Sequence, residues 1–108
     1  MFLVVSKYFI PKGYAGMTIY PFIILKEKKY LDNKVTINHE KIHIRQQLEL
    51  MILPFYMIYF GQLFWNYLKY RNFYKAYMNI IFEKEAYANE KNLDYLQSRS
   101  FWNFKKYF

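Results

Sequence analysis

Three residues of this chain, His39, Glu40 and His43, have types and a spacing that could do chemistry. On a helix, residues four positions apart lie one turn apart on the same face, so both imidazoles would point in one direction. Imidazole nitrogens are common zinc ligands, and a zinc ion with three protein ligands keeps one position for a water molecule of lowered pKa. Glu40, about 100° round the helix from His39, would flank the metal and accept the proton of that water. The spacing therefore predicts the zinc site of a hydrolase.

A chance match to so short a pattern is the alternative, with two solvated histidines on an ordinary helix. The chain contains 2 histidines, however, and both belong to the pattern. Apolar residues at helical spacing also run through it, namely Ile37, Ile44, Leu48, Met51 and Ile52. Both observations favour the metal site, which then needs a third ligand.

The composition limits which groups could hold the metal and which surfaces the protein could bind. The 108 residues predict a single domain over positions 1–108, and 55% hydrophobic content is enough for a core. Cysteine is absent, so a metal must use histidine and carboxylate ligands. The net charge of +8 and the 24% aromatic content suit an anionic membrane surface or a nucleic acid.

The distribution of charge favours the membrane over the nucleic acid. Lysine and arginine are scattered over all segments without a stripe on one helix, and no nucleic-acid-binding motif is present. We therefore expect no nucleic acid partner. The apolar start, Met1 to Val5, is followed at once by Ser6 and Lys7, without the cationic start and cleavage site of a signal peptide. These features predict a membrane-associated protein on the cytoplasmic side.

Residues 1–35 are predicted to form a β element and a loop. Pro11 and Gly13 predict an irregular loop after a short first strand. Residues 17–26 are rich in β-branched and aromatic side chains and predict a strand, which Pro21 places at a sheet edge. An unpaired edge beside the metal would let a peptide substrate bind as an added strand. A plain hairpin that covers the core fits the same residues.

The helix that carries the histidines is predicted to span residues 36–53. Thr36 is in a position to cap its first turn, and Pro54 follows directly after its last residue. A helix of this length would present both histidines and Glu40 from one continuous element.

A hydrophobic helix is predicted to follow over residues 54–71. Residues 50–68 form a stretch of 19 without a charge, but a helix from Pro54 to about Tyr70 would be only about 24 Å long, short of a bilayer core of ~30 Å. An interfacial helix, a tilted span and a homodimer interface remain as alternatives. Trp65, Lys69 and Arg71 favour association with a membrane, because such residues anchor helices at lipid head groups.

A third helix is predicted over residues 72–97, with Glu85 in the middle of its apolar face. A carboxylate in such a place is costly unless it is paired or binds a metal. The segment 98–108 is a basic, aromatic tail, which fits either a second surface anchor or a tail that packs back on the domain.

His39-Glu40-x-x-His43, followed by Glu85-Ala86-Tyr87-Ala88-Asn89, resembles the gluzincin metallopeptidases, in which a glutamate on a second helix completes the zinc site. It resembles in particular the HtpX and CAAX-prenyl-protease group and the BlaR/MecR sensor peptidases, whose second motif runs Glu-x-x-Ala-Asp. The resemblance implies one zinc ion held by His39, His43 and Glu85, with Glu40 as general base.

Two neighbours of Glu85 fit this resemblance. Ala88 is small enough for the third helix to approach the first, and Asn89 could accept a hydrogen bond from a ligating histidine. Glu83 is the rival ligand, because Glu83-x-x-Ala86 also fits the short form of the pattern. We favour Glu85, since only Glu85 has a polar residue at plus four, and we assign Glu90 to solvent.

These observations predict a mainly α fold with a small N-terminal β element (α+β): about three helices plus a short hairpin or edge strand. The predicted function is a membrane-associated, zinc-dependent peptidase that acts on a peptide or protein substrate. The alternative is a catalytically weak or inactive zinc-binding module that is membrane-associated; the intact Glu40 favours the enzyme. Two histidines and a carboxylate also suit iron, and Glu40 within the motif favours zinc.

Overall fold

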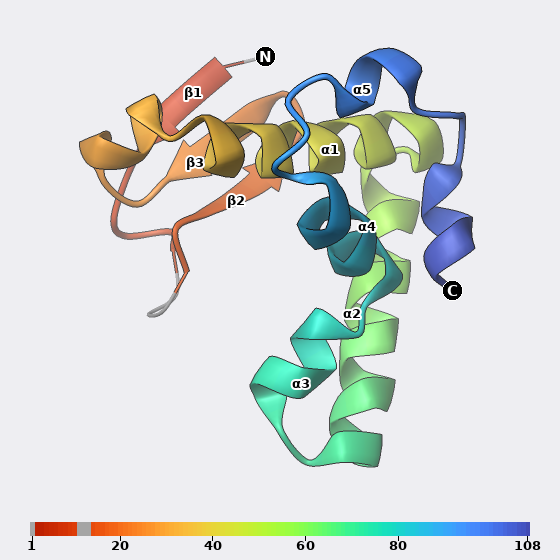
Figure 1. Ribbon diagram of the computed structural model, residues 1–108. Coiled ribbons are helices and arrows are strands. Elements are labelled where there is room, and N and C mark those ends of the chain that lie inside the picture. The colour runs from red at the N-terminus through yellow and green to blue at the C-terminus, as the bar shows by residue number, and fades with distance from the viewer. Residues whose placement is uncertain (1, 11–13) are drawn as a thin grey trace.

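Figure 1 shows the computed structural model, which describes residues 2–10 and 14–108. The loop predicted at Pro11 and Gly13 lies outside the described residues. A small sheet at the N-terminus is followed by helices, so the predicted mainly α fold with a small β element is confirmed. The elements in chain order are β1 (Phe2–Val5), β2 (Gly16–Ile19), β3 (Phe22–Leu25), the 3₁₀ turn η1 (Lys28–Asp32), α1 (Lys34–Leu50), α2 (Ile52–Tyr70), α3 (Phe73–Met78), α4 (Ile81–Asn89), α5 (Tyr95–Ser98) and the 3₁₀ turn η2 (Asn103–Tyr107).

The sheet has the strand order β1-β3-β2, with β3 parallel to β1 and antiparallel to β2. The strand predicted over residues 17–26 is therefore two strands, which are joined by a tight turn at Tyr20 and Pro21. Proline has no N–H for a ladder, so it ends β2 and does not lie within an edge strand. The hairpin places β2 at the edge of the sheet and packs it against α1.

The first helix, α1, begins two residues earlier and ends three residues earlier than predicted. The Asn33 side chain, not that of Thr36, caps it and accepts a hydrogen bond from the Thr36 backbone N–H at 3.1 Å. Met51 has a positive φ of 68° and separates α1 from α2, whose axes meet at 113°. Pro54 lies in the first turn of α2, a position that suits a residue without an N–H. The bend between α1 and α2 therefore lies at Met51, and Pro54 does not end the first helix.

The helix predicted over residues 72–97 is three short helices, α3, α4 and α5. Asn79 closes α3, because its side chain donates to the Lys75 carbonyl at 2.8 Å, and Ile80 is extended. The chain changes direction at this point: α3 packs along α2, whereas α4 packs across α1. The direction of α4 decides which of its glutamates faces the histidines.

Helix α1 lies between the sheet and α4 and carries an unusual run of buried polar residues. Its buried positions include Asn38, His39, Glu40, His43, Gln46 and Gln47. Its apolar residues join two small cores, Ile44 with the sheet and Ile42 with Ala86 of α4. Burial of so many polar groups on one helix is costly unless they bind one another or a ligand.

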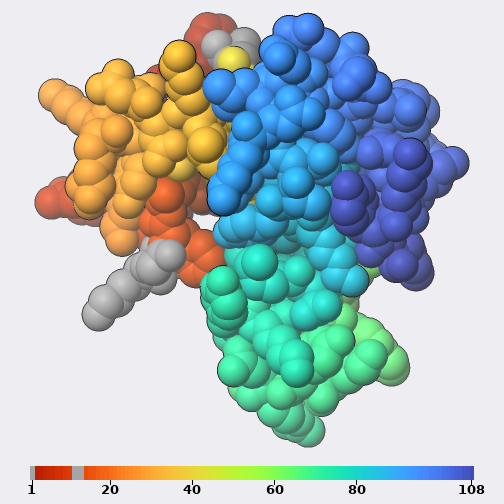
Figure 2. Space-filling model, in the orientation of Figure 1, coloured from red at the N-terminus to blue at the C-terminus, as the bar shows by residue number. Residues whose placement is uncertain are grey.

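Helix α2 has the opposite character. Phe55 is its one fully buried residue, and it stacks on Phe82 of α4 in a third core that includes Phe104 of the tail. The outer part of α2 projects with α3 from the rest of the molecule, as the green segments in Figure 2 show. Large apolar side chains therefore remain exposed along α2.

Candidate metal centre

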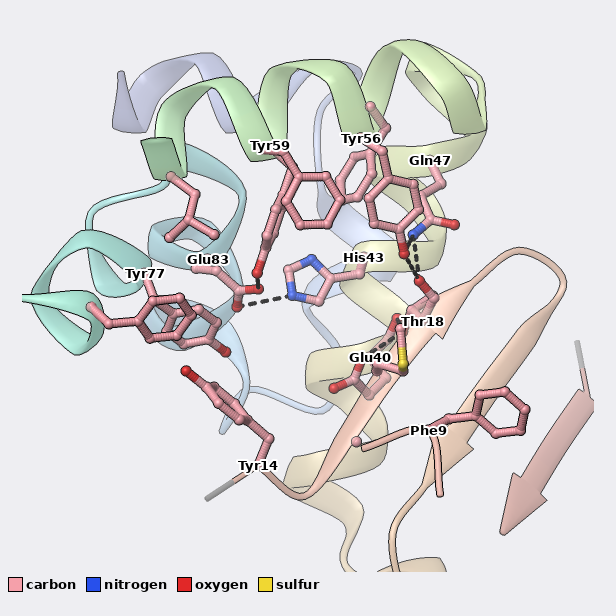
Figure 3. Close-up of a pocket in the computed structure, with 16 residues that line it drawn as sticks. Phe9, Tyr14, Thr18, Glu40, His43, Gln47, Tyr56, Tyr59, Tyr77 and Glu83 are labelled. Carbon is pink, nitrogen blue, oxygen red and sulfur yellow. Dashed lines mark hydrogen bonds and ion pairs between the residues drawn. The ribbon is translucent and has the colours of Figure 1, made fainter. Parts of the chain in front are cut away.

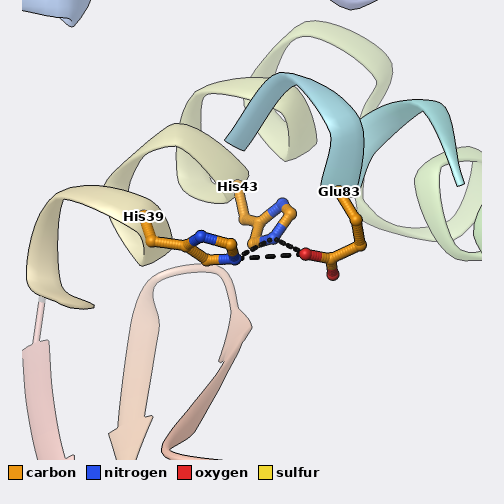
Figure 4. A group of neighbouring side chains, drawn as sticks. All are labelled: His39, His43 and Glu83. Carbon is orange, nitrogen blue, oxygen red and sulfur yellow. Dashed lines mark hydrogen bonds and ion pairs between the residues drawn. The ribbon is translucent and has the colours of Figure 1, made fainter. Parts of the chain in front are cut away.

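Two histidines of α1 and one glutamate of α4 meet inside the protein (Figure 4). Nε2 of His39 lies 3.1 Å from Oε1 of Glu83, and Nε2 of His43 lies 3.0 Å from the same oxygen. The two Nε2 atoms are 3.2 Å apart. All three side chains are buried, and together they could hold a metal ion.

The three distances resemble those between ligands of one tetrahedral zinc ion. Ligand atoms about 2.0–2.1 Å from zinc and separated by the tetrahedral angle lie roughly 3.3 Å from one another. The observed separations are 3.0, 3.1 and 3.2 Å. Two imidazoles and one carboxylate are also the ligand set of zinc hydrolases that leave a fourth position open. The residues therefore fit a divalent metal such as zinc.

Hydrogen bonds on the far side of each imidazole direct both lone pairs to this point. Nδ1 of His39 lies 2.8 Å from Oε2 of Glu90, and Nδ1 of His43 lies 2.7 Å from Oε1 of Gln46. Both partners are acceptors, so in the neutral rings each Nδ1 carries the hydrogen and each Nε2 carries the lone pair. Two lone pairs and a carboxylate oxygen of Glu83 then converge, which is unfavourable unless a cation lies between them.

Without a metal, a proton supplies that cation. Burial alone would lower the pKa of His43, but the neighbouring Glu83 carboxylate outweighs burial and raises the pKa to about 9. Burial would raise the pKa of Glu83, but the imidazoles of His43 and His39 hold it well below its usual range. Protons and a metal ion therefore compete for the same atoms.

Tyr59 of α2 fixes the orientation of the Glu83 carboxylate. Its hydroxyl donates to Oε2 of Glu83 at 2.6 Å, which leaves Oε1 facing the two histidines. Burial, strengthened by the charge of Glu83, raises the pKa of Tyr59, so the hydroxyl keeps its proton and remains a donor. Helix α2 thus takes part in the site although it contributes no ligand.

Glu85, the predicted third ligand, points away from the histidines, and the prediction is corrected to Glu83. Residues two positions apart on a helix are about 200° apart, so the two carboxylates leave opposite sides of α4. The Glu85 carboxylate is fully buried and accepts hydrogen bonds from Arg99 at 2.5 and 3.1 Å, from Tyr95 at 2.5 Å and from Gln46 at 2.9 Å.

The Glu85 network joins the tail to the two helices of the site. Arg99 also donates to both carboxylate oxygens of Glu49 on α1, at 2.7 and 2.9 Å. The backbone N–H of Trp102 donates to Glu49 as well, at 3.1 Å. Of the two alternatives for the tail, the structure supports the one that packs back on the domain.

The roles predicted for Ala88 and Asn89, two neighbours of Glu85, are also wrong. Ala88 is exposed, and the small residue packed between α4 and α1 is the fully buried Ala86. Asn89 binds no histidine: its side chain donates to the Glu85 carbonyl at 2.8 Å and to the Tyr107 hydroxyl at 2.9 Å. The residue that accepts a hydrogen bond from His39 is Glu90, so the prediction that Glu90 faces solvent is wrong.

Glu40, the predicted general base, lies beside the three ligands and is buried. Thr18 of β2 donates to its Oε2 at 2.5 Å and so orients the carboxylate. Its Oε1 faces Gly16. If Gly16 were replaced by a residue with a side chain, the Cβ atom would lie 3.6 Å from that oxygen and only 2.9 Å from the carbonyl oxygen of Ile24. The absence of a side chain at Gly16 keeps the space beside Oε1 open.

Two cavities meet at Glu40. The first, of about 480 Å³, is shown in Figure 3 and reaches His43 and Glu83. The second, of about 420 Å³, reaches His39 and Glu90. Tyr14, Gly16, Glu40 and Tyr77 line both. The candidate metal site therefore adjoins cavities on two sides, although His39, His43 and Glu83 are themselves buried.

The edge of β2 that was expected to accept a substrate strand is partly occupied by the protein itself. Nε2 of Gln47 donates to the Thr18 carbonyl at 2.9 Å, and the Tyr56 hydroxyl donates to the same oxygen. Oε1 of Gln47 accepts from the Tyr20 backbone N–H at 2.7 Å. These groups are unavailable to an added strand, which could pair only nearer to Gly16.

Several residues of the site carry no signal in the sequence beyond their polar type. Thr18, Gln46, Tyr59 and Glu90 come from four different segments, and only folding brings them to the ligands. Of these residues, Gln46 could have been identified from its position in the sequence. It lies one turn after His43 on a helix face that is otherwise buried, where an amide needs a partner.

Comparison of the chain with known protein families, with curated proteins and with solved structures finds no match.

Proposed function

We propose that this protein is a zinc-dependent peptidase, with His39, His43 and Glu83 as zinc ligands and Glu40 as general base. The observation that carries the proposal is the convergence of two imidazole lone pairs and one carboxylate oxygen beside a second, oriented carboxylate. The resemblance of the His-Glu-x-x-His segment to gluzincin peptidases supports the reaction class. With Glu83 as ligand, the second motif reads Glu83-x-x-Ala86.

The side chains have the following roles in peptide hydrolysis. Zinc bound at this site supplies Lewis acidity, which makes water a stronger acid and a peptide carbonyl a stronger electrophile. Oε1 of Glu40, the oxygen not bound by Thr18, takes the proton of the attacking water. The same carboxyl group then returns that proton to the leaving amine.

Tyr14 and Tyr77 are the donors that we assign to the oxygen on which negative charge develops. Both line both cavities, and their rings pack edge to face with centroids 5.2 Å apart. Burial, with the charge of Glu83, raises the pKa of both hydroxyls, so both keep their protons at neutral pH. Hydrogen-bond donors held in place at such an oxygen are a large source of rate enhancement.

The alternative is a zinc-binding module that lacks catalysis. Glu40 supports the enzyme, because a structural zinc site has no use for a buried carboxylate at the junction of two cavities. Glu40→Gln separates the two functions. It should leave zinc content unchanged and abolish cleavage of a quenched fluorescent peptide library, whereas unchanged cleavage would exclude Glu40 as the base.

Metal content is the first measurement for the proposal. Elemental analysis of the purified protein should find about one zinc per chain. Glu83→Ala should lose the zinc, and Glu85→Gln should keep it at a temperature where circular dichroism shows that the variant is folded. A parent protein that takes up no zinc when zinc is supplied would refute the peptidase.

We also propose that the protein works at an anionic membrane surface. The residues on the outer face of α2 have exposed fractions of 71% (Leu53), 67% (Met57), 66% (Phe64), 69% (Trp65) and 43% (Leu68). An apolar face of this kind is unusual on a soluble monomer. The net charge of +8 complements anionic lipid. In the described part of the chain, no single helix is long and apolar enough to cross a membrane. Helices α1 and α2 taken together have the length and composition of a span, but the chain bends by 113° between them.

Sedimentation with lipid vesicles tests this location. The protein should bind phosphatidylserine vesicles and bind pure phosphatidylcholine vesicles more weakly. Replacing both Phe64 and Trp65 by serine should weaken binding by at least about tenfold, because each large apolar side chain contributes roughly 1.5–3 kcal/mol when fully buried. Tyr8→Ser, a change at another exposed aromatic residue, is the control. Equal binding of all variants, or a change from dimer to monomer in the double variant without vesicles, would contradict the membrane surface.

A further inference from the structure

The two cavities that meet at Glu40 differ in their chemistry. We propose that the first cavity binds a large apolar side chain, aromatic or long aliphatic, of the residue on one side of the cleaved peptide bond. This inference rests on the proposed peptidase activity and adds the class of substrate to it.

Among the described residues that line the first cavity, Glu40, His43 and Glu83 carry carboxylate or imidazole groups, and these groups lie at or beside the candidate metal position (Figure 3). The wall of this cavity also includes Phe60 and Leu63 of α2, Phe73 of α3 and Met17 of β2. Figure 3 shows the aromatic rings of α2 above His43 and the β2 strand below it. A group that enters from the metal therefore meets apolar side chains.

Tyr56 and Tyr59 of α2 line this wall. Burial raises the pKa of Tyr56 to about 12, so Tyr56 is uncharged at neutral pH. Their hydroxyls are already used, since Tyr59 donates to Glu83 and Tyr56 donates to the Thr18 carbonyl. They present their rings to the cavity. The part of this wall that the structure describes offers no charged partner, so a charged substrate side chain would lose its hydration there without compensation, which is costly.

The volume of the cavity suits a large group. At about 480 Å³ it lies within the range of roughly 300–1,000 Å³ that encloses small-molecule ligands. An alanine or glycine would leave most of this apolar space unfilled. Filling it with a phenyl ring or a long alkyl chain removes apolar surface from water on both partners.

The second cavity provides the contrast on the other side of the metal. In addition to the shared residues it is lined by Ala15, Thr36, His39, Tyr74, Tyr87 and Glu90, and all of these except Ala15 carry hydrogen-bonding side chains. A peptide that crosses Glu40 would thus meet an apolar cavity on one side and a polar cavity on the other. The preference for a large apolar residue should be confined to one side of the cleaved bond.

Binding of simple hydroxamic acids to the zinc-loaded protein tests the inference without any turnover. The hydroxamate group chelates zinc, and the attached chain can enter either cavity. Octanohydroxamic and 3-phenylpropanohydroxamic acid should bind at least about tenfold more tightly than acetohydroxamic acid and 6-aminohexanohydroxamic acid, measured by calorimetry. Each series is run on protein whose zinc content has been measured.

Two variants locate the preference. Leu63→Trp should fill the cavity and Phe60→Ala should remove part of its wall, so both should reduce the tenfold preference while zinc content stays at one per chain. Tyr67→Ala, an exposed aromatic residue of α2 outside the cavity, should retain it. Equal affinity for the apolar and cationic probes, no binding of any probe to zinc-loaded protein, or an unchanged preference in both folded variants would overturn the inference alone. Failure of the parent protein to bind zinc would overturn the proposed function and the inference with it.

Discussion

Two glutamates of α4, Glu83 and Glu85, are both buried and lie two residues apart, yet they have opposite surroundings. Glu85 has its own cation, because Arg99 contacts both of its oxygens. Glu83 faces two imidazoles whose lone pairs point toward it, and its one hydroxyl partner, Tyr59, is neutral. A buried carboxylate paired with an arginine is already neutralised, whereas one that faces two imidazole lone pairs and a neutral hydroxyl needs a proton or a metal ion as its cation. The partner, more than the burial, thus distinguishes a candidate metal ligand from a structural residue.

Glu83→Ala should produce the largest effect on metal binding and a small effect on the fold. Removal of one of three ligands should abolish stoichiometric zinc binding, measured by elemental analysis after dialysis. The metal-free variant should unfold at a temperature close to that of the metal-free parent protein, because the two histidines can then remain neutral. A variant that still holds one zinc per chain would remove the distinction between the two glutamates.

Arg99→Met should produce the complementary result. It leaves the buried carboxylates of Glu85 and Glu49 without their cation, and loss of one partner of a buried pair costs about 3–5 kcal/mol. Denaturant unfolding of the metal-free protein measures this loss. Zinc affinity of the folded fraction should change much less than in Glu83→Ala, and a selective loss of zinc affinity with unchanged stability would contradict the assignment.

Glu90→Gln should weaken the metal site without destroying it. The amide can still accept from Nδ1 of His39, but the negative charge that makes the ring a better ligand is gone. Changes to groups that orient metal ligands commonly cost about 10–100-fold in affinity. Competition with a fluorescent zinc chelator measures the change, with Asn89→Ala as a control at a residue that contacts no ligand. A larger effect from Asn89→Ala would restore the original prediction for that residue.

Acid should weaken the Glu85 network gradually. Burial would raise the pKa of Glu85, but hydrogen bonds from Arg99, Tyr95 and Gln46 outweigh burial and lower it. The folded protein therefore binds fewer protons than the unfolded chain, and this stability is present above the unfolded pKa of about 4.5 and is lost as the pH falls through the folded pKa. Unfolding of the metal-free protein between pH 6 and pH 3 should show this loss. The Glu85→Gln variant should show a shallower dependence, and equal slopes would exclude the contribution.

The sequence was sufficient for the part of the site that lies within one helix. The spacing of His39, Glu40 and His43 fixes their directions once α1 forms, and the need for a carboxylate on a later helix follows from the metal. The choice between Glu83 and Glu85 depended on treating residues 72–97 as one helix and on the polar residue after Glu85. The break at Asn79 and Ile80 sets the rotation of α4, and tertiary packing decides that break.

The sheet shows the same limit. The composition of residues 17–26 predicted β structure that Pro21 interrupts. A proline fits both an edge strand and a plain hairpin, so the sequence left these two alternatives open. A turn at Tyr20 and Pro21 folds the segment back so that β2 lies against α1. Thr18 then reaches Glu40, a contact across 22 residues that no local pattern contains.

The position of Arg99 has a consequence for truncated forms of this protein. The three candidate metal ligands and Glu40 all precede Arg99 in the sequence, and Arg99 neutralises Glu49 of α1 and Glu85 of α4. A proteolytic cut directly before Arg99 would keep every candidate ligand but leave these two buried carboxylates without their cation, which opposes the contact between α1 and α4. The segment that follows α5 thus helps to hold together the two helices that carry the candidate ligands.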